Sequence, residues 1–270
     1  MSALLRRVPR LLLAAALWSA ALPPGPLRAQ EASATRAQVD SLLLHTELPS
    51  FTASVETAFG EHFLRLSTNL TTLDEVRDAA SRAFADSLIR RDVAAYLVDE
   101  AEAGRLETLL GWLAAGAAAE MRAITDTTPL PQGFDEFVDG LEETPPRPRR
   151  VELVRRWAEA RRAGDFVLLL DEAQREAAHR VAAAVDAEAA PFVPIGEEEF
   201  GPVHAQITAY SVLSFLHRLQ PVPDRVLEGA IREYESEPGQ WFVETYSLAL
   251  AHAVREASRR IVDALGRPGA

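Results

Sequence analysis

The fold class of this chain is decided by the stretch Asp165–Ala189, whose sequence is DFVLLLDEAQREAAHRVAAAVDAEA. Its apolar side chains recur at steps of three and four residues, which matches the 3.6-residue turn of an α-helix. Alanine, the residue with the highest helix propensity, is abundant, and no strand-like alternation interrupts the pattern. The stretch therefore predicts an amphipathic helix with one face in a core. That face consists of Phe166, Leu170, Ala173, Ala177, Val181 and Ala184.

The same periodicity continues along the rest of the chain. We therefore expect an all-α, multi-helix bundle. Two start signals support it, because Thr72 followed by Glu75 is typical of a capping box and Pro223-Asp224 is typical of a helix N-cap. The expected helices cover 33–48, 51–69, 73–100, 103–125, 150–163, 165–189, 198–219, 224–236 and 239–265.

One of these helices differs from the others in its charge. Phe200–Leu216 contains 17 residues without a formal charge. A helix that is apolar on all sides is buried, so this stretch predicts the central helix of the core. Its Gln, Thr and Ser residues favour a protein core over a membrane span.

The helices can be divided into two similar halves, 30–125 and 150–265. A shift of 115 residues places Val39 on Val154 and Phe51 on Phe166, so each half would contain four helices. The alternative is that any two amphipathic helices align somewhere. A proline-rich acidic linker, 126–149, separates the halves. Inside it, Phe134, Phe137, Val138 and Leu141 predict a short amphipathic helix that docks on the protein's own surface, and 266–270 is expected to be a disordered tail.

The amino terminus has the pattern of an export signal. Arginines at positions 6, 7 and 10 precede the 12-residue apolar run Leu11–Leu22, and a small residue, Ala29, offers a cleavage point. The apolar run is shorter than the roughly 20 residues of a spanning helix. We expect 1–29 to be a signal peptide and the mature protein to be periplasmic or secreted. An uncleaved membrane anchor is the alternative.

The composition excludes several chemistries. The 270 residues include no Cys and no Lys, which rules out disulfides, thiol nucleophiles, Schiff bases and P-loops. The formal net charge is −12, so we expect no nucleic-acid partner. The exclusive use of arginine as the strong base is typical of a GC-rich bacterial genome.

Near the carboxyl end, a short motif combines Tyr234, Ser236, Pro238, Gly239 and Trp241. Pro238 lacks an N–H and Gly239 permits a close approach, so the motif predicts a kink or tight turn packed on another helix. The stretch Tyr234–Phe242 resembles the exported bacterial family called domain of unknown function 2059, although Glu237 stands between the serine and the proline here. The resemblance implies export and a helical fold, and no activity is assigned to that family.

Three candidate groups could carry chemistry. Glu172, Glu176 and His179 share one helix stripe, as in di-iron carboxylate bundles, but no second copy exists, so we expect a solvated face. His204 and His217 flank the uncharged helix and are expected to be core histidines with satisfied hydrogen bonds, with a catalytic base as the alternative. We therefore predict no catalytic, cofactor-binding or metal-binding residue.

A basic cluster is the third candidate, with seven arginines in 16 residues. It could contact an envelope protein or anionic lipid, or pair with the protein's own acidic linker helix. The sequence thus favours an exported, non-catalytic helical protein that acts by protein or envelope binding. The alternative is a hydrolase or metal-dependent enzyme with residues dispersed over helices. The cluster comprises Arg147, Arg149, Arg150, Arg155, Arg156, Arg161 and Arg162.

Overall fold

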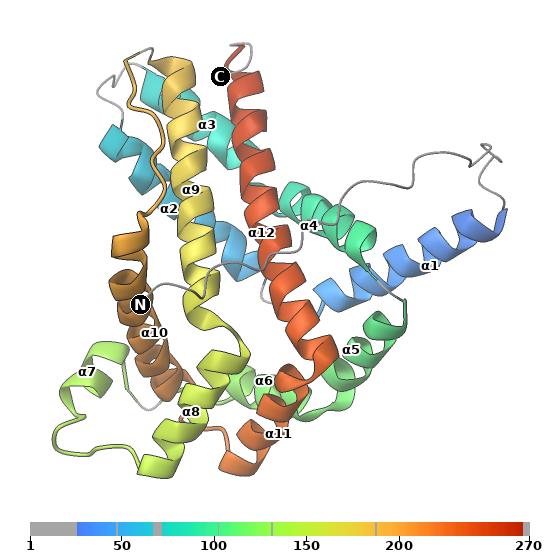
Figure 1. The fold of residues 1–270 in the computed structure, drawn as a ribbon, viewed down its shortest axis with the longest axis vertical. Coiled ribbons are helices and arrows are strands. Elements are labelled where there is room, and N and C mark those ends of the chain that lie inside the picture. Colours follow the sequence, from blue (N-terminus) through green and yellow to red (C-terminus); the bar gives the residue numbers. More distant parts are fainter. Residues whose placement is uncertain are drawn as a thin grey trace, which may run out of the picture.

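The computed structural model describes residues 26–46, 48–66, 72–101, 103–130, 132–186 and 188–266. These residues form 12 α-helices and no strand, which confirms the all-α prediction (Figure 1). Most of the predicted signal peptide and nearly all of the predicted tail lie outside the described residues. In the described ranges, no helix is both long enough and apolar enough to cross a membrane.

The helix bounds follow the predicted segments closely, with three differences. The first helix covers Pro26–Leu43, where 33–48 was predicted. The segment 73–100 is divided before Asp86, and the segment 103–125 is divided at Gly116, whose backbone is extended. Thr72 does begin a helix, but its side chain makes no capping hydrogen bond. The helices are α1 Pro26–Leu43, α2 Leu48–Leu66, α3 Leu73–Ala83, α4 Asp86–Glu100, α5 Ala103–Ala115, α6 Ala117–Thr127, α7 Phe134–Asp139, α8 Pro148–Ala160, α9 Ala163–Val185, α10 Glu197–Arg218, α11 Asp224–Glu235 and α12 Glu237–Ala264.

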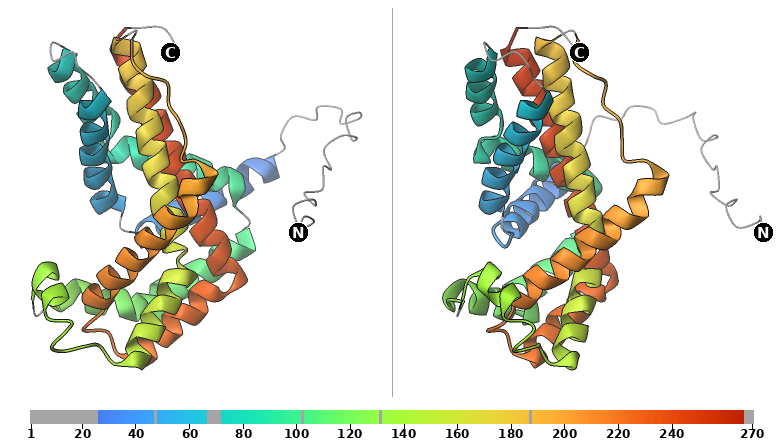
Figure 2. Two further views of the ribbon diagram at one scale, coloured as in Figure 1. Left: turned by 60° about the vertical axis from the view of Figure 1, so that its left-hand side comes forward. Right: turned by 90° about the vertical axis from the view of Figure 1, so that its left-hand side faces the viewer.

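The core is organised around α9 and α12, which run side by side in all views (Figures 1 and 2). Ala173, Ala177 and Val181 of α9 are fully buried, so the predicted core stripe is confirmed there. In α12 the fully buried positions Ala249 and Ala253 are also small. Small side chains let two helix axes approach closely, and α2, α3 and α4 cover the rest of this pair.

The prediction that Phe200–Leu216 is the central helix is wrong. Within α10 only Ser211, Leu216 and His217 are buried, while Phe200 and Tyr210 are 48% and 61% exposed. The helix lies against the outer sides of α8 and α9 (Figure 2). A lack of charge does not make a stretch apolar on all sides, because five of these 17 residues carry a hydroxyl or amide group. The helices that do form the core carry charges on one face and a regular apolar stripe on the other.

The short helix in the linker docks as predicted. Phe137 of α7 is buried, and its ring lies 5.4 Å from the ring of His217 on α10. Phe134 contacts the same imidazole at 5.6 Å. The acidic residues of α7, Asp135, Glu136 and Asp139, are exposed, and the linker helix packs on α10.

Candidate functional site

The sequence motif near the carboxyl end forms the corner between α11 and α12. Ser236 has an extended backbone and caps α12, because its Oγ accepts from the Gly239 N–H at 3.3 Å. The same hydroxyl donates to the Glu233 carbonyl at 2.6 Å. Pro238 lies in the first turn of α12, where a helix leaves its N–H groups unpaired. The predicted tight turn is therefore present at this corner.

Gly239 is required by the close approach of α11. A Cβ at this position would lie 2.7 Å from the Cα of Tyr234 and even closer to the carbonyl oxygen of Glu233. Both contacts are with backbone atoms, which cannot move aside as a flexible side chain would. Any other residue would force the corner open.

Glu233 connects this corner to the amino end of α6. Its carboxylate accepts from the backbone N–H groups of Ala117 and Ala118, each at 2.8 Å, at the amino end of α6. Next to it, α11 approaches α6 so closely that a Cβ on Gly229 would lie 2.5 Å from the Cβ of Ala117. Glu233 thus caps a helix that begins 116 residues earlier in the chain.

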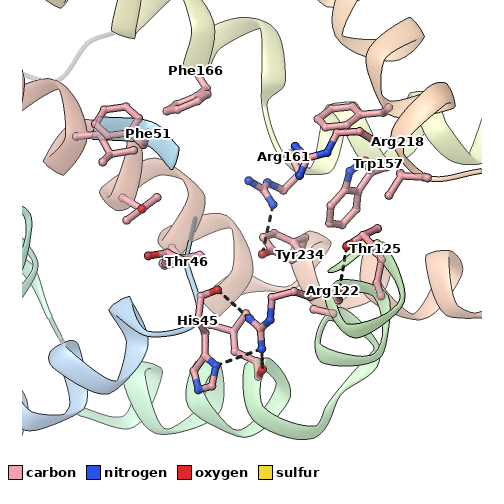
Figure 3. Close-up of a pocket in the computed structure, with 18 of the residues that line it drawn as sticks. His45, Thr46, Phe51, Arg122, Thr125, Trp157, Arg161, Phe166, Arg218 and Tyr234 are labelled. Carbon is pink, nitrogen blue, oxygen red and sulfur yellow. Dashed lines mark hydrogen bonds between the residues drawn. The ribbon is translucent and has the colours of Figure 1, made fainter. Parts of the chain in front are cut away.

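A pocket of about 390 Å³ lies beside the α11–α12 corner, and residues from 45 to 125 and from 157 to 250 line it. Its volume is at the lower end of the range of small-molecule sites. Figure 3 shows side chains from both halves directed into it. The buried parts of its wall are apolar, and they include Leu113, Met121, Tyr234, Phe242 and Leu250.

The charge of the pocket is one-sided. Arg122, Arg161, Arg218 and His45 line it, and no Asp or Glu is found among the lining residues that the structure describes. Arg161 and Arg218 are exposed, which places them at the mouth, while the apolar residues form the floor. A cleft lined by one sign of charge focuses the electrostatic potential and attracts ions of the opposite sign, here anions.

Arg122 is committed to holding the pocket wall together. Its guanidinium donates to the His45 carbonyl at 2.8 Å, to His45 Nδ1 at 3.2 Å and to the Leu113 carbonyl at 3.0 Å (Figure 3). Because arginine can only donate, His45 Nδ1 is the acceptor. Burial lowers the pKa of His45, and the positive charge of Arg122 lowers it further. His45 is therefore a neutral part of the wall at pH 7.

Arg161 has a different environment. It ends α8, and its guanidinium lies over the rings of Trp157 and Tyr234, 5.4 and 5.0 Å from their centroids. Its Nη1 is 3.5 Å from the Tyr234 hydroxyl. Arg218 is the last residue of α10 and lines the same pocket. Each arginine is thus at the C-terminus of its helix, where the helix dipole stabilises a cation.

The two histidines that the sequence singled out do not share a cavity. His217 is buried and donates from Nε2 to the Gln132 carbonyl at 2.8 Å, so the prediction of a satisfied core histidine is confirmed for it. His204 is only half-buried and contacts Asp165 at 3.0 Å, so placing it in the core is wrong. The reason is the peripheral position of α10.

Glu176 does not point into solvent as predicted. It accepts from Arg180 of its own helix at 3.0 Å and from Arg255 of α12 at 2.6 Å, and it thus connects the two core helices. His179 contacts the Ala190 carbonyl at 3.0 Å. Over the described ranges, no group of three or more His, Asp or Glu side chains could hold a metal ion.

The arginine cluster is largely paired inside the protein. Arg156 lies 2.9 Å from Glu235, and Arg150 lies 2.8 Å from Asp224, both on α11. Arg149 pairs with Glu228 of the same helix. The acids of α11, and not those of the linker helix, therefore neutralise this surface.

The motif contributes unequally to the pocket. Tyr234 is 6% exposed and contacts the rings of Trp112 and Trp157 at centroid distances of 5.0 and 5.1 Å, so it forms part of the pocket wall. Trp241 lies under Arg105, at 5.8 Å, away from the pocket. The sequence did not indicate His45, Arg122, Arg218 or Glu233, because their partners are distant in the chain.

Comparison with family models, with curated proteins and with solved structures finds no match to this chain. What the pocket does must therefore be inferred from its own residues.

Proposed function

We propose that this is an exported, non-catalytic helical protein that binds a small anionic molecule in the pocket between its two halves. The observation that carries the proposal is the pair Arg161 and Arg218 at the mouth of an aromatic pocket. The described residues that line the pocket include no Asp or Glu. Arginine is well suited to recognising planar anions, because its N–H groups form a rigid fork.

Export is part of the proposal, and the arrangement of α1 is compatible with it. Cleavage after Ala29 would leave the later part of α1 in the mature protein. Val39, Leu42 and Leu43 of that helix are buried, and they lie after the cleavage point. Export also agrees with the resemblance of Tyr234–Phe242 to an exported bacterial family.

A duplicated architecture is a further part of the proposal. Its support is that corresponding helices have corresponding neighbours: α1 packs on α4 and α5, while α8 packs on α10 and α11. Each half also contains one extended residue that separates two consecutive helices, Gly116 in the first and Ser236 in the second. A pocket between two such halves receives side chains from both.

The anion site is tested by titrating the mature protein with small carboxylates, sulfate and phosphate, using isothermal calorimetry and the fluorescence of Trp157 and its neighbours. We expect the double variant R161Q/R218Q to lose at least tenfold in affinity. R155Q is the matched control, because Arg155 lies on the same helix, is exposed and does not line the pocket. Equal losses in both variants, or no binding of any anion, would contradict the proposal.

Export is tested separately. The protein is expressed with its own amino terminus in a bacterium, the periplasm is released, and the amino-terminal residue of the recovered chain is determined. We expect a soluble periplasmic chain that begins at Gln30. A full-length chain in the cytosol would refute this part and leave the anion site unaffected.

A further inference from the structure

We infer that the ligand is an amphipathic carboxylate of the fatty-acid class, with its head at Arg161 and its chain along the pocket floor. This inference rests on the proposed anion site and specifies its ligand. It follows from how the pocket is divided. The charged residues Arg161 and Arg218 are exposed at the mouth, and the residues of the floor are buried and apolar.

The head of the ligand is defined by the environment of Arg161. The rings of Trp157 and Tyr234 lie beneath its guanidinium, at 5.4 and 5.0 Å, and cover that side of the group. Its Nη1 donates to the Tyr234 hydroxyl at 3.5 Å, and the side chain is exposed. A planar carboxylate can pair with two N–H groups of an exposed guanidinium in parallel. Arg122 is not the head-binding residue, since its donors are used by His45 and Leu113.

The floor accommodates a chain. Leu113, Met121 and Leu250 are buried there beside Phe242, so a ligand that enters can place an apolar chain against them. The polar part of the lining consists of other residues, among them His45, Thr46, Ser54, Arg122 and Thr125. Methionine and leucine side chains adapt to the shape of a flexible guest more readily than a rigid wall does. A head group without an apolar body would leave this surface in contact with water.

The ring geometry favours a flexible chain over a planar aromatic acid. Trp157 is nearly perpendicular to Tyr234, at 79°, and to Phe215, at 73°. Phe242 and Tyr246 stack directly on each other, with centroids 5.3 Å apart. None of these three pairs forms a slot of parallel faces into which a flat ring could slide. An acyl chain can instead follow the ring edges.

The test measures binding of octanoate, decanoate and dodecanoate to the mature protein, each below its micelle concentration. Decanol, decyl phosphate and 2-naphthoate are the comparison ligands. We expect affinity to rise about fourfold per methylene until the floor is filled. Decanol should bind at least tenfold more weakly than decanoate. In R161Q the affinity for decanoate should fall at least tenfold, while the affinity for decanol should not change. In the control variant R155Q neither affinity should change.

The outcomes separate this inference from the proposed anion site. Tighter binding of 2-naphthoate or decyl phosphate than of decanoate would overturn the fatty-acid assignment, with the anion site intact. Equal binding of decanol and decanoate would overturn recognition of the head by Arg161. No binding of any charged ligand would overturn both. Circular dichroism of each variant shows whether a lost affinity reflects a lost fold.

Discussion

The two helix corners beside the pocket each contain one residue with an extended backbone, but they are stabilised in different ways. At Ser236, between α11 and α12, the residue with the extended backbone caps the next helix with its own hydroxyl. At Gly116, between α5 and α6, the corresponding residue has no side chain, and the carboxylate of Glu233 caps α6 from the other corner. The Ser236 corner is thus encoded locally, whereas the Gly116 corner depends on Glu233 from the Ser236 corner.

This difference gives the carboxyl-terminal motif a wider role than its own turn. Glu233 caps α6, and Tyr234 forms part of the pocket wall. Arg122 binds the Leu113 carbonyl across the Gly116 corner and thereby holds α5 and α6 together. Changes at the Ser236 corner should therefore affect both corners, whereas changes at the Gly116 corner should remain local.

The largest effect is expected for Gly239→Val. The added side chain would meet the backbone of Glu233 and Tyr234, so we expect the free energy of unfolding to fall by about 3 kcal/mol. Urea denaturation measures it. Gly111→Ala is the control, because a Cβ there meets nothing within 4 Å and should stabilise α5 by up to about 1 kcal/mol. An unchanged midpoint for Gly239→Val would show that the corner is not tightly packed.

The next largest effect is expected for Glu233→Ala. It leaves the N–H groups of Ala117 and Ala118 without their acceptor, and we expect a loss of about 2 kcal/mol. Glu233→Gln retains one acceptor oxygen and should lose about half as much. Hydrogen exchange of the α6 amides shows where the loss occurs. If the variant increased the exchange rate more in α12 than in α6, the Gly116 corner would not depend on Glu233 in this way.

Ser236→Ala should have a smaller effect. It removes a cap of one N–H group, and we expect a loss of about 1 kcal/mol in urea denaturation. Ser236→Asp keeps the acceptor and should recover part of that loss. If Ser236→Ala lowered the free energy of unfolding more than Glu233→Ala does, the cap of α6 by Glu233 would be less important than the cap of α12 by Ser236.

The smallest effect concerns pH. The pKa of His45 is lowered in the folded protein by burial and by Arg122, so the unfolded chain binds the proton more readily. Stability is therefore complete above the unfolded pKa of about 6.5 and declines as pH falls below it. The pKa of His62 on α2 is lowered as well, so His62 contributes to the same pH dependence. Comparing the wild type with His45→Asn isolates the contribution of His45. The variant should show a shallower decline between pH 7.5 and 5, measured by thermal denaturation.

The sequence predicted what depends on local pattern. The helices, the α9 stripe and the turn at Ser236 follow from periodicity and from the chemistry of serine, proline and glycine over a few residues. The position of α10 was not predictable from its lack of charge, because burial depends on which neighbours compete for the core. The pocket was not predictable either, since His45, Arg122, Arg161 and Arg218 lie on segments that only the fold brings together.

The central claim is that an anionic amphiphile binds between the two halves, with its head at the arginines of the second. The most direct measurement is a crystal structure of the mature protein with 10-bromodecanoate, whose bromine is located by anomalous scattering. We expect the carboxylate at Arg161 and Arg218 and the bromine near Leu113, Phe242 or Leu250. A bromine peak on the outer face of α10, or a carboxylate remote from both arginines, would contradict it.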